Sequence, residues 1–349
     1  MNGYTCACFY ATMIMETEVI MGITIMQTPL SERYQEQYEK FLLSCGLRDE
    51  GDADLIACMM DDVGRLTACG ALAGHTIKQL AVSPDAEGQG VMASILSQLV
   101  SEAAARGIFR LFLCTKPENE RMFSSLGFYT VIGTADAVLM ENRRRGLEDF
   151  LRSLPRYDGV CGAVVCNCDP FTLGHRHLIE YAAAHCDNLY VFAVSESGSM
   201  FAPAVRLDMI RRGTAEIGNC HVFESDLYLV SRATFPAYFI RDEERADEVK
   251  TDLDIELFCR RIAPALGITK RFVGEEPFSP VTRAYNNRMK ELLPEHGIEL
   301  IEIPRLSEIS ASKVRSLIKA GEYARTEEMV PETTYEIIQS RFGADAQRP

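Results

Sequence analysis

The stretch NCDPFTLGHRHLIE, residues 167–180, brings together residue types that bind phosphate at the start of a helix. Thr172 and His175 fall on the first turn of a helix that we expect to begin near Gly174. Backbone N–H groups and the positive end of the helix dipole attract anions there, and both side chains can donate to phosphate oxygens. Gly174 lets a ligand approach the backbone. The segment predicts a phosphate site; the alternative is a Thr N-cap followed by a solvated histidine.

A second helix start, EISASKVRSLIKAG at residues 308–321, has the same character. Ser310 and Ser312 begin the helix, and Lys313 and Arg315 lie in its first turns, where cations normally oppose the helix dipole. A solvated helix face with a serine cap is the alternative. Two helix starts that favour anions within one domain make a shared phosphate site the better interpretation.

The second half of the chain alternates between apolar strands and amphipathic helices. Such alternation predicts a Rossmann-like, doubly wound parallel sheet with helices on both faces. Ligands bind at the carboxyl ends of such strands, so Gly274 and Glu275, at the end of one of them, are expected to contact a ligand. The expected strands are 160–166, 188–195, 219–223, 270–274 and 298–303, and the expected helices are 174–186, 204–216, 254–265 and 281–293.

The first half has a different order, which predicts an α+β domain. A helix at 31–45 precedes hairpin-like strands, a helix at about 90–105 and further strands up to residue 140. The charged stretch ENRRRGLEDFLRSLPRYDG then reads as a helical connector. The predicted division is a poorly ordered N-terminus over 1–30, a first domain over 31–140, a connector over 141–159 and a second domain over 160–349.

The glycine turn at Gly88-Gln89-Gly90 opens the helix at about 90–105. It formally fits a dinucleotide-binding fingerprint, but no acidic residue ends a second strand about twenty residues on, as ribose recognition requires. The turn, together with a later Leu-Gly-Phe at 126–128, resembles the GCN5-related N-acetyltransferases (GNAT), which hold the CoA pyrophosphate there. Glu87 and Met92 depart from that family's pattern, which leaves open whether the turn binds acetyl-CoA or serves only the fold.

The composition excludes several classes of protein. With a net charge of −14 over 349 residues, the chain is a poor match for nucleic acid. Its 12 cysteines contain no C-x-x-C pair and no zinc spacing, so we expect reduced thiols, no protein metal site and a cytoplasmic location. The apolar first 30 residues lack the basic start of a signal peptide, and no run reaches membrane-spanning length.

The two helix-start motifs, Thr-x-Gly-His and Ile-Ser-x-Ser-x-x-Arg, resemble the paired signatures of the nucleotidyltransferase superfamily. With the stretches ATFPAYFIRD and DLDIELFCRRIAPALGITKRFVGEEPFSPVT, the chain is similar to the citrate lyase ligases over roughly residues 35–340. These proteins join an acetyltransferase-like domain to a nucleotidyltransferase domain. One departure is Asp169, where the family usually carries Asn.

The resemblance implies a reaction and its participants. ATP, with Mg²⁺, would activate acetate as acetyl adenylate, and the thiol of the CoA-like prosthetic group on the acyl-carrier subunit of citrate lyase would then take the acetyl group. AMP and pyrophosphate would be released. Thr172, His175, Lys313 and Arg315 would carry the catalysis. The nucleotide-binding residues would be Asn167, Asp169, Pro170, Phe171, Gly174, Arg206, Gly274, Glu275, Ser310 and Ser312, whereas His177 is expected to point away.

Two alternatives remain at this stage. The shared motifs also fit an adenylyltransferase that acts on phosphopantetheine or a similar phosphate. A different class is an acetyl-CoA-dependent acetyltransferase or CoA sensor carried by the first domain. If the ligase interpretation is right, we expect the first domain to dock the carrier or its prosthetic arm.

Overall fold

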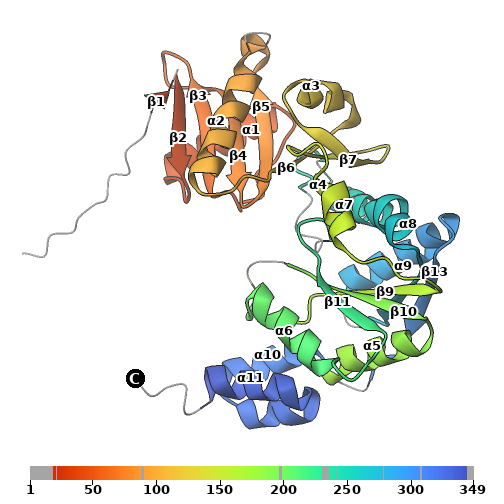
Figure 1. The fold of residues 1–349 in the computed structure, drawn as a ribbon. Coiled ribbons are helices and arrows are strands. Elements are labelled where there is room, and N and C mark those ends of the chain that lie inside the picture. Colours follow the sequence, from red (N-terminus) through yellow and green to blue (C-terminus); the bar gives the residue numbers. More distant parts are fainter. Residues whose placement is uncertain are drawn as a thin grey trace, which may run out of the picture. The chain divides into compact units, whose positions relative to one another are not determined.

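The fold is that of a computed structural model, which describes residues 19–20, 22–87, 90–195, 199–229, 236–240, 242–277, 279–306 and 309–343. The chain divides into two compact units (Figure 1). The first comprises residues up to Leu113 together with 238–241, and the second comprises Cys114–Ala237 and Asp242–Pro349.

The first unit is built on a mostly antiparallel sheet. Of the eight strands of this sheet, β1 to β5 and the first half of β6 lie in this unit, in the order β1-β2-β3-β4-β5-β6. Strand β5 pairs with β6 in parallel through two residues, Thr76 with Phe112 and Ile77 with Leu113. The bounds are Val19–Ile20 for β1, Ile23–Gln27 for β2, Leu55–Met60 for β3, Leu66–Ala73 for β4, Thr76–Val82 for β5 and Phe112–Thr115 for β6.

Two helices cover opposite faces of this sheet. Helix α1 (Glu32–Ser44) buries Tyr38 and Leu42 in a cluster with Cys69 and Ala71 of β4. The residue between those two, Gly70, must face the other way because side chains alternate along a strand. A Cβ added there would lie 2.8 Å from Leu99 Cδ1 of α2 (Val91–Ala105), so α2 packs closely against that face.

The predicted disorder of residues 1–30 is wrong for the end of that segment. Strand β2 pairs antiparallel with β3, Ile23 opposite Met59 through Gln27 opposite Leu55. Ile23 and Ile25 alternate inward and are buried. The apolar residues of 23–26 therefore belong to a core strand. Residues 1–18 and 21 lie outside the described part of the chain.

The second unit confirms the predicted doubly wound parallel sheet. Its five strands lie in the order β11-β10-β9-β12-β13 and all pair in parallel. The order reverses between β10-β9 and β12, which is the kind of switch point where α/β sheets bind ligands. The strands are β9 (Cys161–Cys166), β10 (Asn188–Ala193), β11 (Cys220–Glu224), β12 (Ile268–Gly274) and β13 (Glu299–Ile303).

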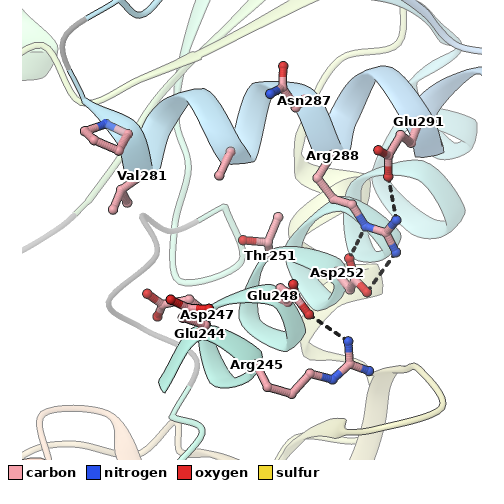
Figure 2. Close-up of a pocket in the computed structure, with 12 residues that line it drawn as sticks. Glu244, Arg245, Asp247, Glu248, Thr251, Asp252, Val281, Asn287, Arg288 and Glu291 are labelled. Carbon is pink, nitrogen blue, oxygen red and sulfur yellow. Dashed lines mark hydrogen bonds and ion pairs between the residues drawn. The ribbon is translucent and has the colours of Figure 1, made fainter. Parts of the chain in front are cut away.

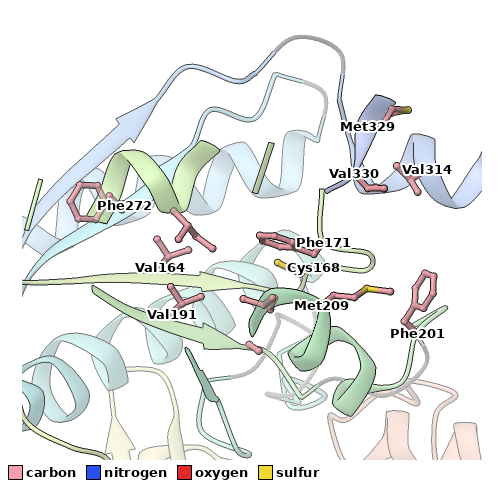
Figure 3. Close-up of a cluster of buried hydrophobic side chains, with 14 of the residues drawn as sticks. Val164, Cys168, Phe171, Val191, Phe201, Met209, Phe272, Val314, Met329 and Val330 are labelled. Atoms are coloured by element: carbon pink, nitrogen blue, oxygen red, sulfur yellow. The ribbon is translucent and has the colours of Figure 1, made fainter. Parts of the chain in front are cut away.

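Helices surround this sheet, and one core joins several of them. Figure 3 shows Phe171 and Cys168, from the turn after β9, beside Met209 of α6, with Val314 of α10 and Met329 also in the cluster. The helices are α5 (Leu173–Ala184), α6 (Pro203–Gly213), α7 (Glu243–Leu257), α8 (Ala263–Leu266), α9 (Pro280–Glu295), α10 (Ala311–Lys319) and α11 (Glu332–Phe342), with short turns Phe258–Ile262 (η3) and Tyr323–Met329 (η4).

Two of these helices differ from the sequence-based expectation. Helix α7 begins at Glu243 and not at residue 254. The residue directly before it, Asp242, caps the helix by accepting from the Arg245 N–H at 2.8 Å. Its highly charged first half hides the apolar periodicity. Helix α11 was not anticipated, because its buried residues Thr334 and Ile338 give only a weak apolar pattern.

The compact units do not divide at the predicted connector 141–159. The hairpin of β7 (Tyr129–Gly133) and β8 (Val138–Glu141), with the preceding α3 (Glu120–Ser125), belongs to the second unit. Arg261 donates to the carbonyl of Val131, and Arg245 pairs with Asp136 at 2.7 Å. Part of the connector is itself a helix of that unit, α4 (Gly146–Ser153).

No helix within the described ranges is long and apolar enough to cross a membrane. The cysteines within the same ranges are free thiols.

Replacing Tyr228 by Phe tests the attachment of the hairpin. Tyr228 Oη donates to Glu141 Oε2 at 2.7 Å, and both side chains are buried. Loss of a donor to a buried carboxylate should lower the free energy of unfolding by about 1–3 kcal/mol, measured by urea denaturation. Tyr129→Phe, at an exposed position of β7, is the control. Equal stability of the two variants would contradict the role of the bond.

Candidate active site

A cavity of about 360 Å³ opens at the carboxyl ends of β9, β12 and β13. It receives the first turn of α5 from one side and the first turn of α10 from the other. Many of the residues singled out from sequence line it, namely Asn167, Asp169, Thr172, Gly174, His175, Gly274, Glu275, Ser310 and Arg315. The structure therefore brings the two predicted phosphate-binding helix starts to one cavity.

The start of α5 is fixed by a capping box between Thr172 and His175. The Thr172 hydroxyl accepts from the His175 N–H at 3.4 Å, and Nδ1 of His175 accepts from the Thr172 N–H at 3.1 Å. This reciprocal arrangement usually uses Glu or Gln at the third helical position. Here an imidazole takes that place, which orients the ring.

The capping box also determines which nitrogen of the neutral His175 ring carries the proton. Because Nδ1 accepts a hydrogen bond from a backbone N–H, the single proton of the neutral ring must lie on Nε2. Partial burial, together with the positive charge of Arg305, lowers the pKa of His175 to about 4. The ring is therefore neutral at physiological pH and can donate through Nε2–H. The hydrogen bond from the Thr172 N–H to Nδ1 orients that donor.

The Thr172 hydroxyl takes part in the cap of α5. The side chain is only 1% exposed, and its hydroxyl lies 3.4 Å from the His175 N and 3.0 Å from Nδ1. The hydroxyl is thus engaged within the helix start. Thr172 therefore helps to orient the His175 ring, and it also lines the cavity.

Asp169 and Arg315 connect the loop after β9 to its surroundings. The Asp169 carboxylate is buried and accepts from the backbone N–H groups of Met200 and Phe201 at 3.0 and 2.9 Å. Arg315 donates to the Asp169 carbonyl, and its guanidinium lies 3.8 Å from the Asp169 carboxylate. The peptide bond from Asp169 to Pro170 is cis. Asp in place of the family's Asn is therefore accommodated by backbone donors and a cation.

At the start of α10, some residues of the motif at 308–321 line the cavity and others do not. Ser310 caps the helix by accepting from the Lys313 N–H at 3.1 Å, and Ser312 accepts from Arg315 Nη2 at 3.1 Å. The Lys313 side chain lines a neighbouring cavity with Arg325 and Glu328. Of the two predicted cations, the structure brings Arg315 and not Lys313 to the site.

Three other predicted residues support the site from behind. Arg206 is fully buried and donates to the carbonyls of Phe201 and Asn167 at 3.1 and 2.8 Å. It is neither a surface residue nor part of the cavity wall. Phe171 is a core residue whose ring stacks on the His175 ring, 6.0 Å between centroids. Pro170 is buried beside it.

Several residues on the cavity wall were not predicted. Arg305 follows β13 and pairs with Glu276 at 3.1 Å. Its position two residues past a strand end was a usable signal. His177 also lines the cavity, contrary to expectation. Arg271, Tyr285 and Asn286 form a deeper part of the wall, and nothing in their spacing distinguishes them from core residues.

The cavity wall offers isolated carboxylates. Such a wall suits a metal ion bound together with a nucleotide better than a metal ion held by the protein alone. The described residues contain no group of three or more His, Cys, Asp and Glu side chains placed to hold a metal. Mg²⁺ in nucleotide sites takes one or two carboxylates plus phosphate oxygens. Glu275 is exposed on the cavity rim, so it can supply such a ligand.

A second, larger cavity of about 600 Å³ lies between α7 and α9. Figure 2 shows Arg288 paired with Asp252 and Glu291, and Arg245 paired with Glu248. The cations of this groove are therefore taken up by carboxylates of its own walls. The first turns of α7 and α9 reach this groove at Glu244 and Val281, but none of the residues at the starts of α5 and α10 lines it.

Comparison with known proteins agrees with the two-part architecture. The family model of the citrate lyase ligase C-terminal domain matches residues 161–338, and that of the GNAT acetyltransferase family matches residues 25–133. The citrate (pro-3S)-lyase ligase of Klebsiella pneumoniae is 39% identical over 87% of this chain and 92% of its own. That of Haemophilus influenzae is 38% identical over 86% and 94%.

Two solved structures are similar to parts of the chain. A crystal structure of TmcAL from Thermotoga maritima bound with alpha-thio ATP is 16% identical, with a TM-score of 0.36, over 53% of this chain and 56% of that one. Escherichia coli ElaA is 13% identical, with a TM-score of 0.31, over 35% of this chain and 98% of its own.

The molecule thus combines an acetyltransferase-like unit with a doubly wound parallel-sheet domain, and the relatives named above are ligases. The chain belongs to the citrate (pro-3S)-lyase ligase family.

The tautomer of His175 can be tested by ¹⁵N NMR of the imidazole signals. We expect the Nε2–H form throughout pH 5.5–8, since the pKa of His175 is lowered from 6.5 to about 4. Since the folded-state value lies below the unfolded one, the stability linked to this group is complete above about pH 6.5 and declines as the pH falls towards 4. The signal is assigned by its loss in His175→Asn. Titration near 6.5, or an Nδ1–H form, would contradict the capping geometry.

Proposed function

We propose that this chain is an ATP-dependent ligase that forms acetyl adenylate and transfers the acetyl group to the prosthetic-group thiol of the citrate lyase acyl carrier. The observation that carries the proposal is a neutral His175, its Nε2–H free to donate, between the starts of α5 and α10 in a member of the citrate (pro-3S)-lyase ligase family.

The first step requires charge neutralisation and positioning. A carboxylate oxygen of acetate attacks the α-phosphorus, the new O–P bond forms, and the bond to the bridging oxygen breaks so that pyrophosphate leaves. Little covalent help is needed for phosphoryl-type transfer. His175 Nε2–H and the N–H of Gly174 would hold phosphate oxygens at the start of α5. Arg315, Arg305 and the start of α10 would neutralise the departing pyrophosphate.

The second step transfers the acetyl group. The carrier thiol, as thiolate, attacks the acetyl carbonyl carbon, the C–S bond forms, and AMP leaves with the electron pair of the broken C–O bond.

In the first step, Mg²⁺ bound with the phosphates would supply positive charge against the leaving pyrophosphate. Glu275 would contribute a protein ligand to it.

Exchange of labelled pyrophosphate into ATP tests the first step. The wild-type chain should catalyse exchange that depends on acetate, and His175→Ala should lower the rate by about 10²-fold or more, the effect of removing one preorganised donor. Far-UV circular dichroism of the variant checks the fold. Exchange that requires phosphopantetheine and ignores acetate would favour an adenylyltransferase instead.

The two cations of the second motif provide a matched pair for the same assay. Arg315→Ala removes a guanidinium from the cavity wall and should slow exchange by about 10- to 100-fold, the range for charge-assisted hydrogen bonds. Lys313→Ala changes a residue two positions away whose side chain lines a different cavity, and it should leave the rate within about three-fold. The reverse order would contradict this account of the pyrophosphate site.

We also propose that the acetyltransferase-like unit receives the carrier's CoA-like arm. In support, β5 and β6 pair through two residues only, as in a sheet that opens towards a ligand. Glu87 places an acid beside the glycine turn, where free acetyl-CoA would put its pyrophosphate. Deleting residues 31–140 would be a poor test, because the deletion removes the β7–β8 hairpin that Arg261 and Arg245 hold in the second unit.

A bulky side chain at the start of α2 is the better test. Met92→Trp enlarges a half-buried residue on the first turn and should slow acetylation of the carrier by about 10-fold or more through steric exclusion. Acetate-dependent pyrophosphate exchange should stay unchanged. Ala104→Trp, at an exposed position near the other end of α2, is the control. Unchanged carrier acetylation in Met92→Trp would mean that the first unit does not bind the carrier's arm. Tight binding of acetyl-CoA to the first unit would instead favour a CoA sensor.

A further inference from the structure

Arg271 is an arginine buried in the middle of β12. Its backbone pairs with Ala163 of β9 and Leu300 of β13, and the residue is only 4% exposed. The guanidinium carbon lies 4.2 Å from the centroid of the Phe258 ring. Nε is buried and has no hydrogen-bond partner. Among the residues that the structure describes, the Arg271 side chain forms neither a hydrogen bond nor an ion pair.

Such a guanidinium is costly to bury. Arginine carries five N–H donors and stays charged, and a buried charge without acceptors is strongly destabilising. Arg206 shows how this chain satisfies a structural arginine. That side chain is also buried, but it donates to the carbonyls of Phe201 and Asn167 and to the Asn167 side chain. No described residue accepts a hydrogen bond from the Arg271 side chain, so a bound ligand would have to supply the acceptors.

The neighbouring carboxylate does not supply them. Asp254, on α7, accepts a hydrogen bond from the hydroxyl of Tyr285 on α9. Partial burial raises the pKa of Asp254, while the Tyr285 hydroxyl and the charge of Arg271 act in the opposite direction. Asp254 therefore lies within electrostatic range of the guanidinium but makes no ion pair with it.

Arg271 belongs to the wall of the active-site cavity. Arg271 lines the same cavity as His175, together with Tyr285, Asn286 and Met289. It comes from three residues before the end of β12, so its Cα lies about 10 Å deeper along the strand than Gly274. The phosphate-binding groups are all at the outer edge. The wall around Arg271 contains aromatic and methionine side chains, which suit a small ion with an apolar end.

We propose that Arg271 binds the carboxylate of the acid substrate, a short monocarboxylate, and holds it for attack on the α-phosphate. The inference rests on the proposed function, since it assigns one substrate to part of that cavity. A guanidinium is well matched to a carboxylate, which it can bind with two hydrogen bonds. Its charge also reduces the repulsion between an anionic nucleophile and an anionic phosphate.

The test compares Arg271→Gln and Arg271→Lys with the wild-type chain. In pyrophosphate exchange, Arg271→Gln should raise the KM for acetate by about 10- to 100-fold, the range for a charge-assisted pair, while the KM for ATP stays within about three-fold. Arg271→Lys keeps the charge and the side-chain stem and should recover part of the acetate affinity. Arg288→Gln, in the separate groove between α7 and α9 (Figure 2), is the control and should match the wild type.

Direct binding separates this inference from the proposed function. Saturation-transfer NMR with [¹³C]acetate should detect saturable binding to the wild-type chain that is lost in Arg271→Gln, and calorimetry should show ATP binding retained. If acetate binds in this way but no exchange occurs, the proposed reaction is wrong and the carboxylate site stands. A rise in the KM for ATP equal to that for acetate would make Arg271 a nucleotide ligand. An unchanged acetate KM in a folded Arg271→Gln, or in Arg271→Lys if Gln does not fold, would overturn the inference.

Discussion

The hydrogen bond from the Thr172 N–H to Nδ1 of His175 connects the start of a helix to the chemistry at its tip. It satisfies one of the unpaired donors of α5, fixes the plane of the ring and requires the ring proton to be on Nε2. A Glu in the same place would cap the helix equally well but would put a negative charge where phosphates are to bind. Histidine performs both tasks because one nitrogen can accept while the other donates.

Around that bond, the loop after β9 is held by hydrogen bonds to the segment before α6 and to α6 itself. Asp169 accepts two backbone N–H groups from 200–201, and Arg206 binds the carbonyl of Asn167. Both side chains join the segment before α6 to the loop, which lies at the switch point of the sheet. A functional group on a loop gains precision from such supports. The buried charges of Asp169 and Arg206 therefore hold the loop in place.

The sequence predicted the sheet and both helix starts well, because apolar alternation, caps and glycine are local signals. It could not assign roles inside the motifs. Thr172 and Lys313 have the right types for phosphate contact, yet the capping box engages one and the direction of the α10 side chains takes the other to a different cavity. Arg271 was invisible for a related reason: a charged residue in a strand looks like an edge position until the tertiary structure buries it. Such roles depend on packing between distant segments, which no local pattern encodes.

The β7–β8 hairpin has a consequence for how a chain of this kind can be assembled. The acetyltransferase family model extends to residue 133, so by ancestry β7 belongs with the first module. Its partners, Arg261, Arg245 and Tyr228, nevertheless belong to the second unit. The boundary of the family match therefore differs from the boundary of the compact units. Recombination with a foreign acetyltransferase module at the linker would exchange the hairpin without its anchoring arginines, so viable chimeras must carry both sides of that contact together.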